Sequence, residues 1–295
     1  MNALNAHQIL EREGRPLIVD VLGDSNGYRH SSNSVRHCSN CCGEIILHGR
    51  YGWLHCESLE RDCLDAENVA TWRGVSRERQ DEWGVTSQNR AQAAIEAGIL
   101  AREITPVTLP DGTTHATDDG PRFGTTLEKL QGLQPVFRED GTVTAGNCCP
   151  LNDGAAALVV MSDTKAKELG LTPLARIVST GVSALSPEVM GLGPVEACRQ
   201  AMARAGMSIG DLDLYEINEA FAAQVLPSAD DLGMDLDKLN VHGGAIALGH
   251  PFGMTGARIT TTLINAMQER DAQFAMESMC VGGGQGMAMI LERLS

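Results

Sequence analysis

From about residue 65 to residue 295, hydrophobic and polar positions follow the spacing of amphipathic helices in some segments and of strands in others. Apolar residues at helical spacing predict a long amphipathic helix over Ser76–Ala97, with Ser76 as its N-cap. The apolar run within Asp153–Ser162 predicts a buried strand. Further strands are predicted at Ala175–Ser183, Leu212–Ile217, Leu239–Val241, Phe274–Cys280 and Met287–Arg293, and further helices at Pro194–Ala205, Ala220–Leu232 (interrupted near Pro227) and Pro251–Gln268. This alternation predicts an α/β fold, with a mixed sheet and helices on both faces.

Residues 1–64 differ from the rest of the chain in amino-acid composition. They hold five of the nine cysteines and five of the eight histidines, and they contain no lysine. Three interpretations stay open: a poorly structured leader, a segment altered by a reading-frame shift or gene rearrangement, or a zinc module. Zinc-ligand residue types occur at His37, Cys38, Cys41, Cys42, His55, Cys56 and Cys63. No clean second Cys-x-x-Cys pair follows, so no metal site is expected, and 1–64 stays unassigned.

Composition narrows the class of protein. The chain is 43% hydrophobic and 21% charged, which is typical of a globular protein, and it has no apolar run long enough to span a membrane. The net charge of −15 disfavours a nucleic-acid partner. The first residues lack a basic region followed by an apolar one, and cysteines are frequent, so we expect reduced thiols and a cytoplasmic location.

One stretch stands out as a candidate site. Asn240–Arg258 reads NVHGGAIALGHPFGMTGAR, which predicts a strand, a glycine-rich turn and a helix that begins at Pro251. His250 lies between Gly249 and Pro251 at the mouth of the turn, where it can act on a ligand. Two other stretches accompany it: Asn218–Phe221 after a predicted strand, and Cys280–Gly286 between two apolar runs.

The blocks NEAFA, GGAIALGHPxGxTGAR and CVGGGQG, in this order, resemble the thiolases, a family of acetyl-CoA acetyltransferases and 3-ketoacyl-CoA thiolases. The resemblance runs from about residue 65 to 295. It implies a thiolase-like fold with an incomplete first half-domain. The implied parts are an insertion region at 65–150, the last strand and helix of the N-terminal half at 151–170, and a C-terminal domain at 171–295.

The resemblance also implies roles for individual residues. His250 is the base beside the nucleophile, Cys280 the acid/base at the substrate α-carbon, and Asn218 the holder of a water that stabilises an enolate oxygen. The Gly282 N–H serves a second oxyanion hole. Each has a simpler alternative: a structural histidine, an inert packed cysteine, a strand-end cap and a bare turn glycine.

Substrate contacts are implied at Cys149, Phe221 and Gly249, although helix-core packing explains Phe221 nearly as well. The sequence departs from the family at Asn147–Pro150, where thiolases usually have Asn-Ala-Ser-Gly. Cys149 stands in place of the serine that contacts CoA, and a thiol is a weaker hydrogen-bond donor than a hydroxyl. The nucleophilic cysteine block of the first half has no convincing match. Val35–Ser39, which includes Cys38, resembles it only faintly.

The expected function is therefore thiolytic cleavage of 3-ketoacyl-CoA or the reverse Claisen condensation, an acyltransferase reaction of fatty acid metabolism such as β-oxidation. Coenzyme A is a substrate, no cofactor is implied, and a homo-oligomer is the family expectation. The alternative is a catalytically inactive, truncated or frame-shifted thiolase remnant.

Overall fold

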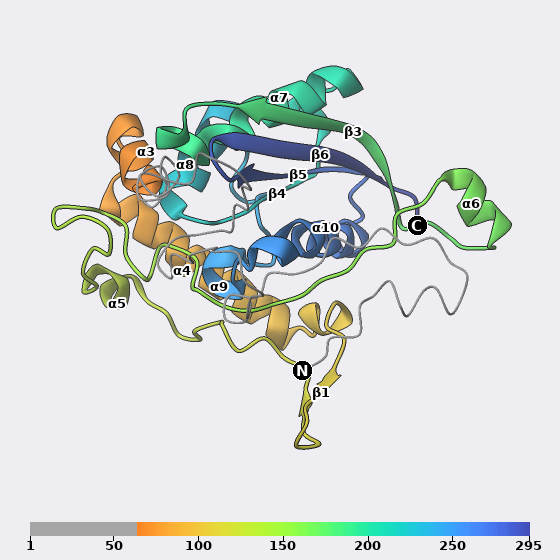
Figure 1. The fold of residues 1–295 in the computed structure, drawn as a ribbon, viewed down its shortest axis with the longest axis horizontal. Helices are drawn as coiled ribbons and strands as arrows, with labels where there is room; N and C mark the ends of the chain where they lie inside the picture. The colour runs from red at the N-terminus through yellow and green to blue at the C-terminus, as the bar shows by residue number, and fades with distance from the viewer. Residues whose placement is uncertain (1–63) are drawn as a thin grey trace, which may run out of the picture.

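The computed structural model of this protein describes residues 64–295 (Figure 1). Its strands are β1 (Val107–Thr108), β2 (Thr114–His115), β3 (Ala175–Ala184), β4 (Leu214–Ile217), β5 (Phe274–Val281) and β6 (Gln285–Arg293). Its α-helices are α3 (Asp65–Arg73), α4 (Arg77–Glu96), α5 (Leu127–Gln131), α6 (Asp163–Glu168), α7 (Gly193–Ala205), α8 (Ala222–Leu232), α9 (Ala245–Leu248) and α10 (Phe252–Glu269). Three 3-10 helices complete it: η1 (Leu100–Arg102), η2 (Pro187–Leu192) and η3 (Ile209–Asp211).

The central sheet is mixed. Its strand order is β3-β6-β5-β4, with β4 parallel to β5 and the other neighbours antiparallel. In Figure 1, α7 lies above the strands and α10 below them. The predicted α/β class, with a mixed sheet and helices on both faces, is confirmed.

Adjacent side chains of a strand point to opposite faces of the sheet and therefore pack into two different hydrophobic cores. Tyr215 and Met276 pack with α7 and α8, whereas their neighbours Leu214 and Ala275 pack with α10. Strands β4 and β5 are thus covered on both faces, which explains why β4 is buried along its whole length.

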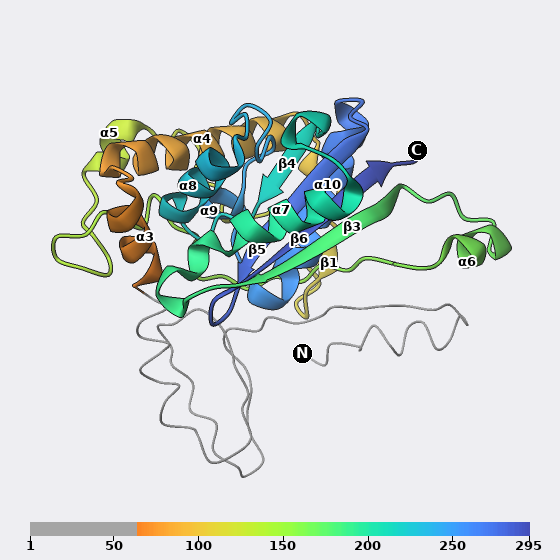
Figure 2. The same cartoon turned by 90° about the horizontal axis from the view of Figure 1, so that it is seen from above.

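Local sequence signals set several helix ends. The Ser76 side chain accepts a hydrogen bond from the Arg79 N–H, so it caps α4 as predicted. Gly206 ends α7 in the left-handed conformation, with φ of 66°. In the view from above, α4 runs across the same end of the molecule as α8 and α9 (Figure 2).

The buried strand predicted within Asp153–Ser162 is wrong. No strand among residues 64–295 pairs with this segment in the sheet, and alternate side chains along it are exposed. Val159 and Val160 are 61% and 40% exposed. An apolar run becomes a buried strand only when neighbouring strands and layers cover it, and the sequence of the run does not supply them.

Two smaller predictions also fail. The helix α8 continues through Pro227. A proline removes one hydrogen bond of the helix and crowds the preceding turn, and the packing of the buried side chains around Pro227 offsets this cost. The strand predicted at Leu239–Val241 is reduced to one parallel bridge between Tyr215 and Leu239.

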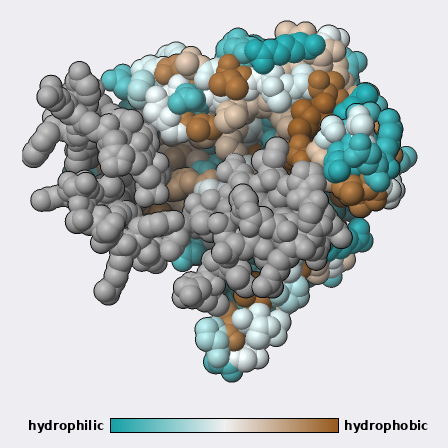
Figure 3. Space-filling view, turned by 45° about the vertical axis from the view of Figure 1, so that its right-hand side comes forward, coloured by the Kyte–Doolittle hydropathy of each residue, from teal (hydrophilic) through white to brown (hydrophobic). Residues whose placement is uncertain are grey.

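Apolar residues reach the surface in patches among polar ones on the face that Figure 3 shows. The exposed apolar side chains include Leu151, Leu171, Leu174, Ile177 and Val182. Within residues 64–295, no helix combines the length and the apolar character needed to cross a bilayer.

Candidate active site

The carboxyl ends of β4 and β5 bring two of the predicted site residues to one edge of the sheet. The strands are parallel, with Ile217 opposite Ser278. Asn218 directly follows β4, and its backbone N–H donates to the Ser278 carbonyl at 2.9 Å. Cys280 lies near the end of β5 and is 8% exposed. The side chains of Asn218 and Cys280 therefore belong to adjacent strand ends.

The helix α10 carries His250 toward the same edge. A methyl group on Gly256 would lie 3.4 Å from Met279 Cε, and Thr260 Oγ1 lies 3.0 Å from Glu277 Oε2. Residue numbers rise along α10 as they fall along β5, so the helix runs antiparallel to the strand. Its N-terminal end, with His250 just before it, consequently lies at the Cys280 end of β5.

The His250 ring is held by local contacts. Its Nδ1 lies 2.6 Å from Thr255 Oγ1, and its ring centroid lies 4.9 Å from that of Phe252 in an edge-to-face arrangement. Its backbone N–H donates to the Asn152 side chain at 3.2 Å. Burial, followed by the positive charge of Arg258, lowers the pKa of His250 to about 4. The imidazole is therefore neutral at neutral pH and able to accept a proton.

The Asn218 side chain is fully buried, yet neither its amide nitrogen nor its oxygen has a hydrogen-bond partner in the described structure. A buried amide without partners carries a desolvation cost of about 1–3 kcal/mol. Such a group fits a position that a ligand or an ordered water satisfies.

Phe221 and Cys280 lie in one apolar cluster, and Cys148 packs against it. Phe221 and Cys280 belong to the same buried group, and the Phe221 ring lies 5.9 Å from that of Phe137, edge to face. The Cys149 N–H donates to the Ala220 carbonyl at 3.0 Å, and Cys148 forms a bridge with Phe221. The structure thus places the Asn147–Pro150 block against the NEAFA segment.

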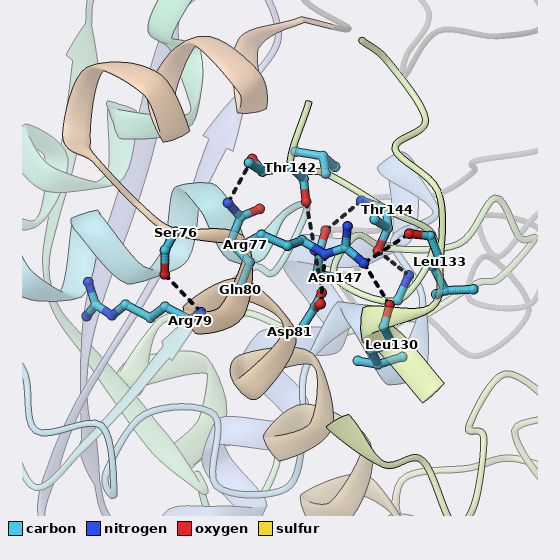
Figure 4. A network of polar contacts seen from close by, with 12 residues as sticks. Ser76, Arg77, Arg79, Gln80, Asp81, Leu130, Leu133, Thr142, Thr144 and Asn147 are labelled. Atoms are coloured by element: carbon cyan, nitrogen blue, oxygen red, sulfur yellow. Dashed lines mark hydrogen bonds and ion pairs between the residues drawn. The ribbon is translucent and has the colours of Figure 1, made fainter. Parts of the chain in front are cut away.

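The Asn147–Pro150 block is fixed on its other side to α4. The Asn147 amide donates to Asp81 at 2.8 Å and to the Thr142 carbonyl at 3.1 Å, and its oxygen accepts from the Thr144 N–H at 2.8 Å (Figure 4). Arg77 also pairs with Asp81, at 2.7 Å. This network ties the segment of Cys148 and Cys149 to the start of a long, well-capped helix.

The predicted site glycines, Gly282 and Gly249, lie in tight turns. Gly282 is exposed in the turn between β5 and β6, where Gly284 adopts φ of 96° and a side chain would overlap the Leu185 carbonyl. Gly249 adopts φ of 91°, and a side chain there would overlap the Asn152 amide. The positive φ of Gly249 and of Gly284 favours glycine in both turns.

The sequence prediction missed Glu219, which follows Asn218 and is completely buried. Its carboxyl group accepts hydrogen bonds from Trp83 and Ser87 on α4, from Asn240, and from the backbone N–H of Ile246. Glu219 lies within the NEAFA motif, which marks the segment as important. Its hydrogen-bond donors belong to segments far away in the sequence, so the motif does not reveal its contacts.

Several predictions concern residues outside the described range. Cys38, the Val35–Ser39 block and the zinc-ligand residue types all lie in 1–63. Among residues 64–295, no cluster of histidine, cysteine or acidic side chains is arranged to hold a metal ion. Of the cysteines in that range, Cys198 is unsuited to nucleophilic chemistry, because burial raises the pKa of its thiol to about 12.

Family models match almost all of the described chain. The model for the N-terminal domain of thiolase matches residues 56–164, and the model for the C-terminal domain matches residues 171–293. An acetyl-CoA acetyltransferase of Escherichia coli is 50% identical over 283 residues, which cover 95% of this chain and 69% of that protein. The chain belongs to the thiolase family.

Further thiolases are similar to this chain in sequence and in structure. An acetyl-CoA acetyltransferase of Cupriavidus necator is 53% identical over 234 residues, which cover 78% of this chain and 60% of that protein. The crystal structure of human mitochondrial 3-ketoacyl-CoA thiolase in complex with CoA superimposes with a TM-score of 0.76 at 46% identity, and covers 78% of this chain and 58% of that chain. The chain thus spans about 60% of the length of several relatives it matches.

Proposed function

We propose that this chain acts in thiolase chemistry, the transfer of an acyl group between coenzyme A thioesters with formation or cleavage of a carbon–carbon bond. The observation that carries the proposal is the buried, unsatisfied Asn218 amide beside the strand end that bears Cys280. Family membership supports it, and so do the positions of His250 and the glycine turns.

In this proposal His250 is the base. Thr255 Oγ1 donates to the Pro251 carbonyl at 3.0 Å, so its oxygen is left to accept from Nδ1–H of His250 at 2.6 Å. This arrangement favours the tautomer with the proton on Nδ1 and an open lone pair on Nε2. The lone pair on Nε2 takes a proton from the reacting thiol.

Cys280 removes a proton from the α-carbon of the acyl group and returns it in the reverse direction. The negative charge then develops on the thioester oxygen. A water held by the Asn218 amide stabilises that oxygen, together with His250, which donates to it from Nε2 once that nitrogen holds the proton taken from the thiol. The Gly282 N–H serves the second oxyanion site. Charge stabilisation of this kind contributes several kcal/mol to catalysis.

The substrate is a CoA thioester whose pantetheine arm passes Cys149, Phe221 and Gly249. The proposal includes no metal or redox cofactor, because the residues named above supply the base, the acid/base and the two oxyanion sites, and the reaction involves no net electron transfer to the protein. It also includes a role in fatty acid metabolism such as β-oxidation and a homo-oligomer, which the family resemblance implies, and a cytoplasmic location, which the cysteine content and the first residues of the sequence suggest.

The test is hydrogen exchange at the acetyl-CoA methyl group in D2O, followed by mass spectrometry. This half-reaction uses Cys280, Asn218 and His250 and needs no acyl-cysteine. We expect deuterium incorporation by the parent chain, and loss of about 100-fold or more in His250→Ala and in Asn218→Ala, in line with the usual contribution of a base or an oxyanion donor. A parent chain that shows neither exchange nor an acetyl adduct would refute the proposal.

A further inference from the structure

Glu219 is a buried carboxyl group to which the proposed chemistry assigns no role. It is 0% exposed, and both of its oxygens are occupied. Oε1 accepts from Trp83 Nε1 at 3.1 Å and from Asn240 Nδ2 at 2.8 Å. Oε2 accepts from Ser87 Oγ at 2.6 Å and from the Ile246 N–H at 3.2 Å. A buried carboxyl group is retained at such a position only when donors surround it.

These contacts join segments that lie far apart in the sequence. Trp83 and Ser87 belong to α4, and Ile246 belongs to the short helix α9. We call the segment 243–250, which contains α9 and ends at His250, the His250 loop. The Asn240 side chain forms two hydrogen bonds with the last residue of β4. Its oxygen accepts from the Ile217 N–H at 2.9 Å, and its NH2 donates to the Ile217 carbonyl at 2.8 Å. Glu219 is therefore linked both to the strand end that carries Asn218 and to the His250 loop.

The loop approaches Glu219 too closely for any side chain between them. A methyl group on Gly244 would overlap the Glu219 carboxyl group. The Gly244 N–H donates instead to Ser87 Oγ at 3.0 Å, and the same hydroxyl donates to Glu219. Two backbone N–H groups of the loop, those of Gly244 and Ile246, are thus held directly or through one hydroxyl by the same carboxyl group.

We propose that Glu219 is a positioning residue, whose carboxyl group holds the His250 loop at a fixed distance from Asn218. The inference rests on the proposed function, in which Asn218 and His250 act on one oxygen atom. Two groups that share one reacting atom must keep their separation within a fraction of an ångström, and a shift of about 1 Å can cost 100-fold in rate.

The variant that tests this role is Glu219→Gln. The amide oxygen of glutamine can keep the hydrogen bonds from Trp83 and Asn240, and its NH2 can donate to Ser87. The Ile246 N–H then faces another donor and loses its partner, so the change acts on the His250 loop. Trp83→Phe is the matched control, because it removes one donor from the same carboxyl group on the α4 side and leaves the loop contacts intact.

We expect Glu219→Gln to lower kcat for exchange at the acetyl-CoA methyl about tenfold or more, with KM changed less than about twofold. We expect Trp83→Phe to keep kcat within about threefold of the parent. Amide hydrogen exchange of the intact chain should accelerate at Gly244 and Ile246 in Glu219→Gln, and not in α7 or β6. Ser87→Ala, which removes the bridging hydroxyl, should accelerate exchange at Gly244 in the same way.

The outcomes separate the two proposals. Local acceleration of amide exchange at the loop supports the role of Glu219 even in a parent chain without turnover, which would refute only the proposed function. Unchanged exchange at Gly244 and Ile246 in Glu219→Gln overturns the positioning role. Acceleration throughout the domain overturns it as well, because Glu219 would then stabilise the fold in general. Should Glu219→Gln not fold, the Ser87→Ala result decides between the same outcomes.

Discussion

The guanidinium of Arg258 on α10 lies 3.0 Å from a carboxyl oxygen of Glu216 on β4, and the two side chains are only 12% and 3% exposed. The pair joins the helix that begins beside His250 to the strand that ends before Asn218. Arg258 Nε and Nη2 have no hydrogen-bond partner within the described residues. Its positive charge acts on several surrounding groups, and His250 is one whose pKa it lowers.

The pH dependence of activity should reflect this charge. The proposed base must be neutral, and the pKa of His250 is about 4, so kcat/KM should fall with a midpoint near pH 4 on the acid side. Removing the positive charge in Arg258→Met makes protonation easier and moves the acid limb toward the ordinary histidine pKa of 6.5, without reaching it because burial remains. A pH profile between pH 4 and 8 measures this shift.

The control for that profile is Arg79→Met, which removes a more exposed ion pair with Asp230 on the surface. It should leave the acid limb in place. An Arg258→Met variant with the parent profile would show that Arg258 has no electrostatic effect on the base.

The contact between His250 and Thr255 gives a second prediction. Thr255→Val keeps the side-chain volume but removes the hydroxyl that accepts from Nδ1. We expect kcat for methyl-proton exchange to fall at least about tenfold, because His250 can stabilise the enolate oxygen only when its tautomer and orientation are correct, and one oxyanion donor contributes about 100- to 1,000-fold. Thr255→Ser keeps the hydroxyl and should restore most of the rate. Equal losses in both variants would assign the effect to packing.

Cys280→Ser tests the proposed acid/base at the α-carbon. Serine is close in size to cysteine, but its hydroxyl is a far weaker acid, so deuterium exchange at the acetyl-CoA methyl should collapse. The thermal unfolding midpoint should change little because the volume of this buried side chain is nearly preserved. A Cys280→Ser variant that exchanges at the parent rate would make Cys280 an inert packed residue.

The carboxyl group of Glu277 predicts a stability change with pH. Burial raises its pKa from 4.5 to about 7, against the opposing effects of Thr260 and Arg258. The folded state thus holds this proton more tightly than the unfolded state. The contribution is full below pH 4.5 and is lost as the pH rises through 7, with a slope of up to about 1.4 kcal/mol per pH unit.

Glu277→Gln removes that titration while it keeps a partner for the Thr260 hydroxyl, 3.0 Å away in the parent. Urea unfolding at pH 5, 6, 7 and 8 should show a flatter dependence for the variant than for the parent, and a variant that is the more stable of the two at pH 8. Parallel curves for both proteins would mean that Glu277 does not titrate in this range.

The sequence by itself determined the fold class, the family and the three loops that form the candidate site. Their signals are local: Ser76 caps the helix that follows it, Gly206 ends α7, and the glycines around His250 permit turns that other residues cannot adopt. Such preferences depend on a few neighbouring residues, so they can be read along the chain.

Only the tertiary structure decided what each loop contacts. Glu219 gains its role from donors on α4 and on the His250 loop, and Asn218 is notable because burial leaves its amide without a partner. The apolar run within Asp153–Ser162 shows the converse, since no strand of the described sheet covers it. Burial and hydrogen-bond satisfaction depend on residues far away in the sequence, and no local pattern contains that information.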